Sequence, residues 1–456
     1  MDISRLMTRS MKSQSWGLKS ARIMEAALNA VNPQTAVLHC LKREDTQLEV
    51  NREIYDLNTF DRVLLVGAGK AGQPMSEGVQ EVLGDRLNRG LVIVKEGYKT
   101  KNNLTGRINI VEARHPIPDI RGVKGTDEVI ELLENTSQND LVICLISGGG
   151  SALLVSPVPG VSLQDLQRLT EILLASGATI NEINTLRKHL DRIKGGQLAR
   201  FTSPAKLISL ILSDVVGDPL DVIASGPTVP DGTTFKNALA ILEHYQIEDQ
   251  IPAPILEYLK IGEAGMVEET PKPGEQLFAK VNNIIVGSNR TASQAALEQG
   301  LKEGFNTCVL SNFLQGEASQ VGKFLATILR QVAIHNQPIP RPACIIVGGE
   351  TTVTLRGDGL GGRNQEIALG SVEELDGLDG IALITLATDG GDGPSDAAGA
   401  VVTGKTLKHA LTLDLDPQSF LARNDAYNFF DPLGDLLKTG PTQTNVNDLA
   451  FLFAFE

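Results

Sequence analysis

The sequence predicts an α/β protein with two domains, each built on a mostly parallel sheet. Its 456 residues exceed the usual size of one domain, and a hydrophobic content of 42% supplies apolar side chains for two cores. Short strand-like apolar runs alternate with longer amphipathic segments, which is the pattern of βαβ units. Aromatic residues make up only 4% of the chain, while glycine and proline number 45 and 21, so many tight turns are expected.

The expected strands are short apolar runs along the whole chain. In order they cover residues 62–67, 91–95, 108–112, 141–147, 207–213, 283–287, 306–310, 343–348, 381–387 and 450–455. Amphipathic helices are expected between most of them, for example from Thr126 and from Ser162, whose hydroxyls are placed to cap a first turn. Apolar strands joined by helices predict parallel sheets.

A domain boundary is expected near residue 272. The stretch 246–280 is rich in Pro, Gly and Glu and interrupts the alternation of strands and helices, so it is interpreted as a linker. The predicted division is an N-terminal domain of residues 1–272, linker included, and a smaller C-terminal domain of residues 273–456.

Charge and cysteine usage argue against several classes of function. A formal net charge of −14, without a long Lys/Arg stripe, argues against a nucleic-acid partner. No apolar run reaches the roughly 18–20 residues that cross a bilayer, so no membrane partner is expected. The cysteines, Cys40, Cys144, Cys308 and Cys344, are scattered and lie mostly in apolar runs. They indicate buried thiols in a reducing, cytoplasmic compartment rather than disulfides or a metal cluster.

The first glycine motif, GAGKAG at residues 67–72, has the G-x-G-x-x-G spacing of a dinucleotide site. Such a site also needs an acid at the end of the second strand, yet that strand ends in Lys95 and Glu96 comes one place late. Lys70 lies inside the turn, where a cation beside helix N-terminal amides suits a phosphate or a carboxylate. An anion-binding turn is therefore favoured over a nicotinamide site.

Two further glycine motifs differ in how strongly they indicate a phosphate- or anion-binding site. GAVVTGKT at 399–406 matches the phosphate-loop pattern, but turn-forming residues precede it instead of a buried strand, so a short strand and a helix start are expected. SGGGS at 147–151 follows an apolar strand, and its glycines can turn backbone N–H groups toward one point to form an anion nest. A serine hydrolase is disfavoured because Leu153 stands where a nucleophile elbow needs glycine.

Acidic residues follow several other strands, at the sheet edge where ligands bind. Asp214, Glu350 and Asp389 each come shortly after an expected strand. The basic residues that accompany them are Lys70, Lys188 and Arg363. Carboxylates hold Mg²⁺ and basic groups neutralise phosphoryl oxygens. This combination of acidic and basic residues therefore predicts a site for Mg²⁺ and a polyphosphate.

One predicted helix carries a polar stripe. Asn184, Arg187, Lys188 and Asp191 follow the spacing i, i+3, i+4 and i+7, and the opposite face is apolar. Such a stripe is either the solvated side of the helix or the lining of a cleft, and the spacing leaves both interpretations open.

Five linked stretches carry a family resemblance. They read LISGGGSALL, INTLRKHLDRIKGGQLA, SDVVGDPLDVIASGPTVPD, GGETTVTLRGDGLGGRNQEIAL and TDGGDGPSDAAGA. Together they resemble the glycerate 2-kinase family, whose members end in a MOFRL-type domain, and the resemblance runs from about residue 15 to the end. It implies a Rossmann-like N-terminal domain, a smaller C-terminal MOFRL-type domain and an active site in the cleft between them. It also implies phosphorylation of D-glycerate to 2-phosphoglycerate with ATP and Mg²⁺.

The resemblance further implies roles for individual residues. Lys70 and Arg363 match basic catalytic positions, and Asp214 and Glu350 match acidic ones. The residues expected to bind substrate or phosphate are Ser147, Gly148, Gly149, Gly150, Ser151, Asn184, Lys188 and Asn364, and those expected to bind the metal are Asp214, Glu350 and Asp389. Asp214 also counts as catalytic, and Asp214 and His115 are candidate general bases. Asp191 stands where serine is commoner in the family and places an extra negative charge near the anion site.

The sequence leaves three functions open. A kinase would consume D-glycerate with ATP and Mg²⁺, a hydroxypyruvate or 2-hydroxy-acid reductase would oxidise NAD(P)H, and a sugar-phosphate binder would bind without turnover. In each case the expected partner is a small molecule, and the expected assembly is a monomer or a homodimer.

Overall fold

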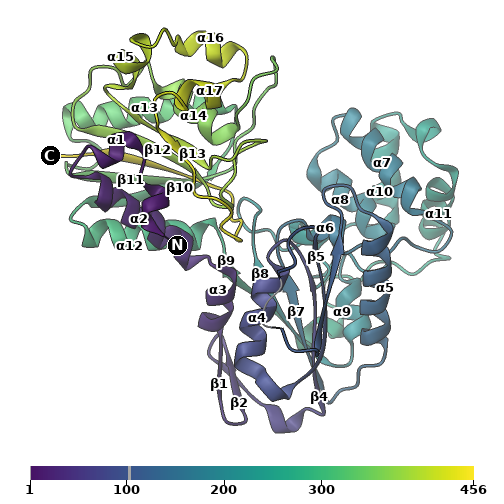
Figure 1. Ribbon diagram of the computed structural model, residues 1–456. Coiled ribbons are helices and arrows are strands. Elements are labelled where there is room, and N and C mark those ends of the chain that lie inside the picture. The colour runs from purple at the N-terminus through teal and green to yellow at the C-terminus, as the bar shows by residue number, and fades with distance from the viewer. Residues whose placement is uncertain (1, 101–103) are drawn as a thin grey trace. The chain divides into compact units, whose positions relative to one another are not determined.

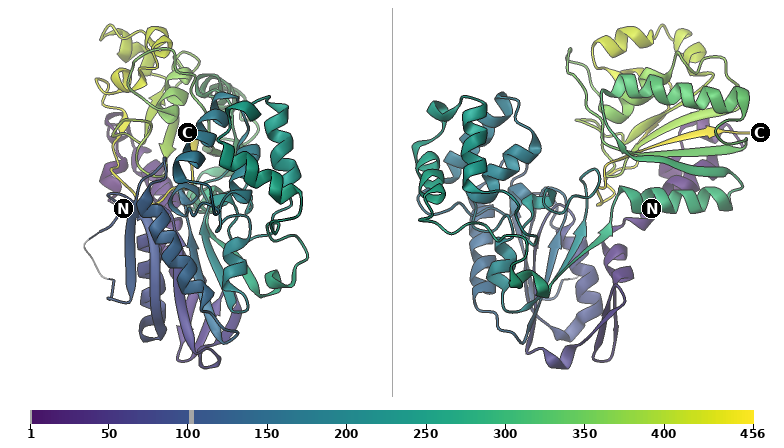
Figure 2. Two further views of the ribbon diagram at one scale, coloured as in Figure 1. Left: turned by 90° about the vertical axis from the view of Figure 1, so that its right-hand side faces the viewer. Right: turned by 180° about the vertical axis from the view of Figure 1, so that it is seen from behind.

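The computed structural model describes residues 2–100 and 104–456 and divides the chain into two compact units (Figures 1 and 2). One unit consists of residues 33–286. The other joins the residues up to 32 to residues 287–456. The predicted boundary near 272 therefore differs from the structural one, and the N-terminal segment belongs with the C-terminal half.

The 33–286 unit is built on a sheet of strand order β6-β5-β4-β7-β8-β9. The strands are β4 (Arg62–Ala68), β5 (Leu87–Lys95), β6 (Ile108–Ala113), β7 (Asp140–Ile146), β8 (Lys206–Leu212) and β9 (Val281–Gly287). Neighbours from β6 to β8 are parallel, as predicted. Helix α4 (Gly72–Leu83) covers one face, with α3 (Pro33–Cys40) packed against it, and α5 (Ile120–Glu134) and α9 (Gln197–Thr202) cover the other (Figure 1).

This unit also contains two further parts, of which the sequence predicted only the helix from Ser162 and the helix around residues 184–191. One is an antiparallel meander of β1 (Leu41–Glu44), β2 (Gln47–Val50) and β3 (Glu53–Asp56). The other is a group of helices with its own apolar core, namely α7 (Leu163–Ala175), α8 (Ile180–His189), α10 (Phe235–His244) and α11 (Ala253–Glu263). Figure 1 shows these four helices together beside the sheet.

The stretch 246–280 is not a linker, because α11 occupies its centre. Ile255 and Leu259 of α11 are buried, and Gly262 brings its backbone against the ring of Phe235 on α10. Two of its prolines, Pro252 and Pro254, lie at the helix N-terminus, a position that tolerates proline. The prediction of a linker from composition alone was therefore wrong, because the stretch contains a helix that packs within the 33–286 unit.

The second unit is built on a sheet of order β10-β11-β15-β12-β13-β14. Its strands are β10 (Asn306–Leu314), β11 (Ala343–Gly349), β12 (Ile381–Ala387), β13 (Gly399–Thr403), β14 (Leu436–Leu437) and β15 (Asp448–Ala454). The main helices are α2 (Gly17–Ala30), α12 (Asn289–Lys302), α13 (Ala318–His335) and α14 (Arg363–Ser371), and the short ones are α1 (Arg9–Lys12), α15 (Thr406–Leu411), α16 (Pro417–Ala422) and α17 (Ala426–Phe430). The short strand predicted within GAVVTGKT is confirmed as β13.

The prediction of a mostly parallel sheet is wrong for this second unit. β10 and β11 are parallel, but β15 runs antiparallel to both of its neighbours, β11 and β12, and β13 is antiparallel to β12 and β14. A strand buried on both faces is a continuous apolar run in either direction, so the sequence does not reveal its polarity.

The N-terminal segment packs against the C-terminal strand of its unit. The Trp16 ring stacks on Phe455 at a centroid distance of 4.5 Å, and Ser10 donates from its N–H and its hydroxyl to the Asp435 carboxylate at 2.9 and 2.7 Å. These contacts explain why the unit includes the residues before position 33.

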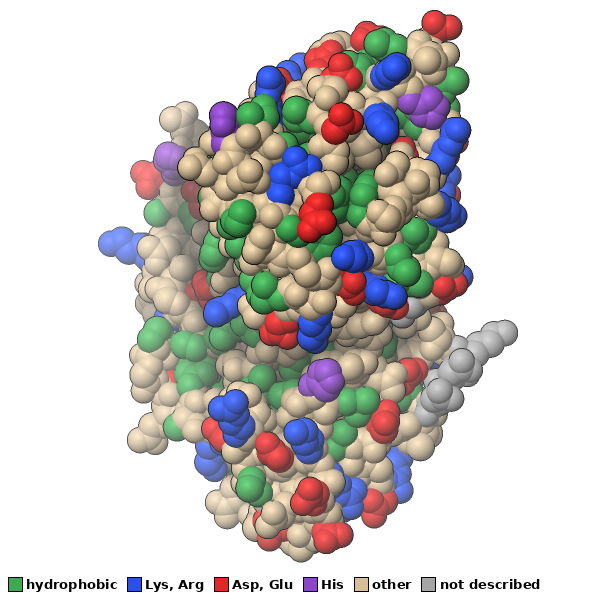
Figure 3. All heavy atoms as spheres, turned by 90° about the vertical axis from the view of Figure 1, so that its left-hand side faces the viewer, with side chains coloured by type: hydrophobic (Ala, Val, Ile, Leu, Met, Phe, Trp, Pro, Cys, Tyr) green, Lys and Arg blue, Asp and Glu red, His purple; other side chains and the backbone are tan. Residues whose placement is uncertain are grey.

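Two further expectations concern the whole chain. All the cysteines are free, and the predicted burial is found for Cys144 and Cys344, whereas Cys40 and Cys308 are only partly buried. Within residues 2–100 and 104–456, no helix has the length and apolar character that crossing a bilayer requires. On the face drawn in Figure 3, acidic and basic side chains are interspersed.

Candidate active site

Two glycine turns meet at the carboxyl edge of the parallel sheet. The turn after β4 carries Lys70, and the turn after the neighbouring β7 carries SGGGS. The Lys70 N–H donates to the Gly148 carbonyl at 2.8 Å, and the Ala71 N–H donates to Ser147 Oγ at 3.0 Å. The structure thus joins two motifs that lie far apart in the sequence.

The glycines of SGGGS leave room for two titratable side chains. A Cβ on Gly148 would lie 2.2 Å from Asp214 Oδ2, and one on Gly149 would lie 2.9 Å from His115 Cδ2. Gly149 also has a φ of +85°, which favours glycine. Asp214 and His115 therefore border the turn that Lys70 approaches, and this group of residues is the candidate anion site.

His115 is uncharged in this site. Burial, together with the positive charges of Lys70 and Lys95, lowers the pKa of His115 to about 4. At neutral pH the imidazole can therefore accept or donate a hydrogen bond without adding charge. The cations that hold it neutral also favour a bound anion.

The structure connects Asn184 to the glycine loop through Ser225. The Ser151 and Ser225 hydroxyls lie 3.0 Å apart, and Ser225 Oγ donates to Asn184 Oδ1 at 3.0 Å. Ala224 and Ser225 have φ values of +50° and +60°, a strained backbone of the kind that clusters at functional sites. Sequence reasoning did not single out Ser225, although it lies within SDVVGDPLDVIASGPTVPD, one of the stretches that carry the family resemblance.

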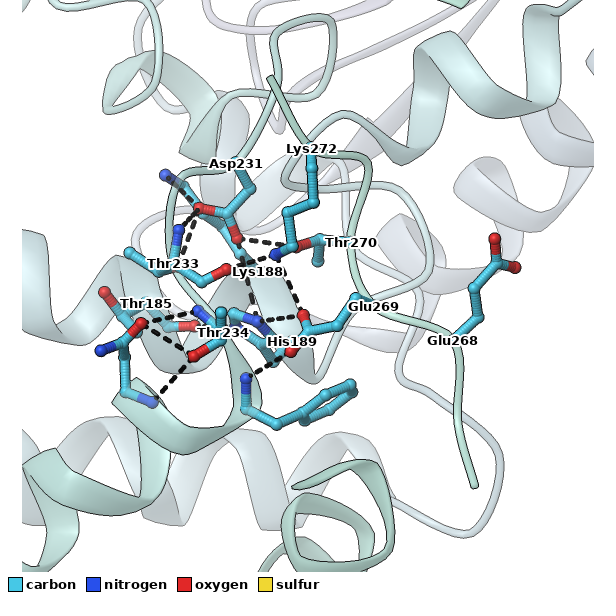
Figure 4. Close-up of polar contacts among 12 residues, drawn as sticks. Thr185, Lys188, His189, Asp231, Thr233, Thr234, Glu268, Glu269, Thr270 and Lys272 are labelled. Carbon is cyan, nitrogen blue, oxygen red and sulfur yellow. Dashed lines mark hydrogen bonds and ion pairs between the residues drawn. The ribbon is translucent and has the colours of Figure 1, made fainter. Parts of the chain in front are cut away.

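Lys188 lies in a buried charge network (Figure 4). Its ammonium is 3.4 Å from Asp231 and 3.8 Å from Asp221. Asp231 also accepts from the hydroxyls of Thr233 and Thr270, at 2.8 and 3.0 Å. Two carboxylates already compensate this lysine, so its contacts in the structure join α8 to neighbouring loops. Its role in substrate binding stays a prediction.

His189 continues the same network. Nδ1 lies 2.8 Å from the Thr185 carbonyl and Nε2 lies 3.1 Å from Glu269. Glu269 in turn pairs with Lys272 at 3.0 Å, and Figure 4 shows these side chains directed toward one another. The network ties the segment 269–272 to the end of α8.

Asp191 does not bring an extra negative charge to the anion site. Its carboxylate pairs with Lys194 at 2.7 Å, both side chains are 2% exposed, and it also accepts from the Ile193 N–H at 3.0 Å. The Lys194 ammonium compensates the Asp191 charge, which corrects the expectation drawn from the family pattern.

Arg363 lies at the start of α14 in the second unit, between two carboxylates. Nη1 donates to Glu350 and Nε donates to Asp448, both at 2.5 Å. Burial raises the pKa of Asp448 to about 6 despite the nearby guanidinium. Sequence reasoning placed Arg363 and Glu350 together but missed Asp448, which lies at the start of the last strand.

Asn364 and Asp392 complete this cluster, which we call the Arg363 cluster. The Asp392 carboxylate accepts from the N–H groups of Asn364 and Gln365 at 3.1 and 2.8 Å, so it caps α14. Burial raises the pKa of Asp392 to about 7. The Asn364 side chain lies 3.4 Å from the same carboxylate. In the structure Asn364 therefore contacts an acid of the protein.

The three predicted metal ligands belong to different units: Asp214 lies in the 33–286 unit, and Glu350 and Asp389 lie in the other. In the described residues, no three His, Cys, Asp or Glu side chains gather as a metal site. Glu350 binds Arg363, and Asp389 accepts from the Gly391 N–H at 3.2 Å. Mg²⁺ in phosphate-transfer sites needs only one or two carboxylates beside substrate phosphates, so Asp214 or Asp389 is chemically sufficient.

Comparison with known proteins gives the family. The model of "Domain of unknown function (DUF4147)" matches residues 19–260, and that of the MOFRL family matches residues 343–448. A D-glycerate 2-kinase from Thermotoga maritima is 42% identical over 427 residues, which cover 94% of this chain and 95% of the relative. The chain belongs to the glycerate 2-kinase family.

Other members of the glycerate 2-kinase family agree in sequence and in fold. A glycerate 2-kinase from Pyrococcus horikoshii is 39% identical, with 94% of this chain and 95% of the relative covered. The crystal structure of a glycerate kinase from Thermotoga maritima matches with a TM-score of 0.85 and 40% identity, and covers 95% of this chain and 98% of that one.

Proposed function

We propose that the protein is an ATP- and Mg²⁺-dependent glycerate 2-kinase. It transfers the γ-phosphoryl group of ATP to the 2-hydroxyl of D-glycerate and releases 2-phospho-D-glycerate. The observation that carries the proposal is the 42% identity, over 94% of the chain, with a protein named D-glycerate 2-kinase. The anion site around Lys70 supports it.

The proposed work of the anion site is to hold and neutralise negative oxygens. Phosphoryl transfer requires mainly that two reactants lie in line and that developing charge is stabilised. The Lys70 ammonium and the SGGGS backbone would bind a phosphate or the glycerate carboxylate. Either Asp214 or His115, which border Gly148 and Gly149, would accept the proton of the 2-hydroxyl.

The proposed work of Arg363 is to stabilise charge on the transferring phosphoryl group. Glu350 and Asp448 hold the guanidinium from two sides and fix its orientation. Both carboxylates serve as positioning groups in this proposal, since each already accepts from Arg363. Mg²⁺ bound with the nucleotide supplies further charge neutralisation, and Asp214 or Asp389 would hold it.

A reductase is the second candidate because of the names of some relatives. A protein from Agrobacterium vitis with a provisional hydroxypyruvate reductase name is 40% identical over 94% of this chain. A dinucleotide site needs a free acid at the end of the second strand. Here β5 ends in Lys95, and Glu96 pairs with Arg121 at 3.0 Å. This pairing argues against a ribose-binding acid and favours the kinase.

A phosphorus NMR time course tests both candidates. The purified protein is incubated with ATP, Mg²⁺ and D-glycerate, while a parallel sample with NADH and hydroxypyruvate is followed by absorbance. A growing signal at the shift of 2-phosphoglycerate is the expected result. A 3-phosphoglycerate signal would refute the position of transfer, and NADH loss without any phosphoglycerate would refute the kinase.

A further inference from the structure

A pocket of about 220 Å³ lies in the 33–286 unit beside the SGGGS loop. Apolar side chains form most of its wall, among them Ile117, Val155, Leu166, Leu169 and Leu173. The polar groups that reach it include Ser151, Gln167, Arg187, Asp191 and Lys194. An apolar pocket with a few polar groups is the usual form of a small-molecule site.

Arg187 is the polar group of this pocket whose hydrogen-bond donors are not used within the described part of the protein. Asp191 and Lys194 compensate each other at 2.7 Å. In contrast, the Arg187 guanidinium makes no hydrogen bond and no ion pair with any residue that the structure describes, although it lies in a partly buried position. Burial lowers the pKa of Arg187, and only the attraction of Asp191 opposes this effect. The guanidinium has five N–H donors beside an apolar wall, so it can donate to a ligand bound in the pocket.

Gln167 adds a hydrogen-bond acceptor to the pocket. Its Nε2 donates to the Pro118 carbonyl at 2.8 Å, and no donor in the described residues reaches its amide oxygen. The pocket therefore offers a guanidinium donor and an amide acceptor within apolar walls. The edge of an adenine ring carries the matching pair, a ring-nitrogen acceptor and an amino donor, on a flat apolar body.

Ser151 links this pocket to the anion site. It lines the pocket, and it is also the last residue of the SGGGS loop, whose Gly148 accepts from Lys70. A ligand with its ring in the pocket can thus place an attached anionic chain along the loop. A nucleotide has this form, whereas glycerate has no ring to fill the apolar part.

We propose that the pocket between the segment 116–118 and helices α7 and α8 holds the adenine ring of ATP. Arg187 donates to a ring nitrogen, Gln167 accepts from the amino group, and the phosphates extend along the SGGGS loop toward Lys70. This inference rests on the proposed kinase function, because it assigns that kinase its nucleotide subsite.

Calorimetric titration of the full-length protein with adenosine, with ATP and with inorganic tripolyphosphate tests the assignment. Thr170→Phe fills the pocket from α7, and Arg187→Met removes the donor. Arg192→Met is the matched control, because Arg192 lies outside this pocket and pairs with Asp127. Circular dichroism and the thermal midpoint check the fold of each variant. If one of the two pocket variants fails to fold, the other still tests the assignment.

At least a tenfold rise in Kd for adenosine and ATP is expected in both pocket variants. Arg192→Met is expected to stay within twofold, and tripolyphosphate is expected to bind Thr170→Phe as it binds the natural protein. Unchanged adenosine and ATP affinity in the pocket variants would overturn the assignment. Binding of benzoate, but not adenosine, in an Arg187-dependent way would also overturn it, since that would define a carboxylate site.

The two proposals fail in different ways. If the natural protein forms phosphoglycerate while the pocket variants keep its KM for ATP, the kinase stands and the adenine subsite is refuted. If no phosphoglycerate forms but adenosine binding depends on Thr170 and Arg187, the subsite stands and the kinase is refuted.

Discussion

At the scale of single residues, the candidate site depends on a few side chains that the backbone turns hold in place. The Lys70 backbone is held because its N–H bonds to Gly148, and the Arg363 guanidinium is held by two carboxylates. The Arg363 cation is therefore oriented before any ligand arrives, which is the condition for electrostatic stabilisation of a transition state.

Replacing Lys70 or Arg363 by alanine is expected to lower kcat with glycerate and ATP by roughly 10²–10³-fold, as for the loss of one preorganised oxyanion donor. Steady-state kinetics measure the effect. Lys236→Ala, which removes an exposed lysine of α10, is the control and is expected to keep its activity. A loss below about fivefold, with an intact fold, would rule out the proposed role.

Gly149→Ala separates backbone strain from steric conflict. Gly149 and Gly160 have similar φ values, +85° and +87°, but a Cβ meets His115 at Gly149 and open space at Gly160. We expect Gly160→Ala to cost about 1–2 kcal/mol of unfolding free energy from strain alone, and Gly149→Ala to cost more and to lower activity. Urea unfolding measures both. Equal costs would contradict the tight fit around His115.

His115 gives a pH dependence whose sign can be stated. Its folded-state pKa of about 4 lies below the usual 6.5, so the unfolded chain binds a proton first as the pH falls. The stability contributed by neutral His115 is complete above pH 6.5 and is lost as the pH falls toward 4. We expect urea unfolding of His115→Gln to show a weaker loss over this window than the natural protein. Exposed His335 provides the control, because His335→Gln is expected to leave the pH dependence unchanged.

At the scale of elements, the sequence predicted more of the fold than of the site. Every expected strand lies on a strand of the structure, because a buried strand is an apolar run of limited length. The N-cap at Ser162 is confirmed by its capping box with Asp165. The one at Thr126 is wrong, since α5 begins earlier, at Ile120, with Asp119 as its N-cap. The residue type decides whether a position can cap a helix. Where one segment offers two such positions, the packing of the helix decides which of them is used.

The site was predicted only in part because its contacts join distant segments. The post-strand motifs with Lys70 and Asp214 could be placed at one sheet edge by topology. Ser225 and Asp448 could not be placed in the site from the sequence. Each belongs to it through contact with a residue far away in the chain, Ser151 for Ser225 and Arg363 for Asp448. The sequence also could not reveal that Lys188, predicted to bind substrate or phosphate, pairs with the distant Asp231.

The network around Lys188 fixes loops to helix α8, and its stability contribution can be measured. Lys188 is 5% exposed and Asp231 is fully buried, so Asp231→Asn leaves a buried ammonium short of its main partner. We expect a loss of about 3–5 kcal/mol in the free energy of unfolding. Glu171→Gln breaks the exposed pair with Arg168 and is expected to cost below about 1 kcal/mol. Similar losses in urea unfolding would contradict a structural role for the network.

At the scale of the whole molecule, the chain begins and ends in the same unit. Trp16 is the only tryptophan of the sequence and stacks on Phe455. We expect Trp16→Ala to destabilise this unit by about 2 kcal/mol through lost aromatic packing, whereas Phe313→Ala, at a side chain 68% exposed, changes it little. Differential scanning calorimetry measures the shift, and equal midpoints for both variants would contradict the packing argument.

The stacking of Trp16 on Phe455 also constrains the order of events during synthesis. A ribosome releases residues 33–286 as one uninterrupted stretch, so that unit can fold as soon as it emerges. The segment before position 33 leaves the ribosome ahead of this unit, but its partners Asp435 and Phe455 leave the ribosome after it. That segment can therefore reach its packed position only after the 33–286 unit and most of residues 287–456 have been synthesised.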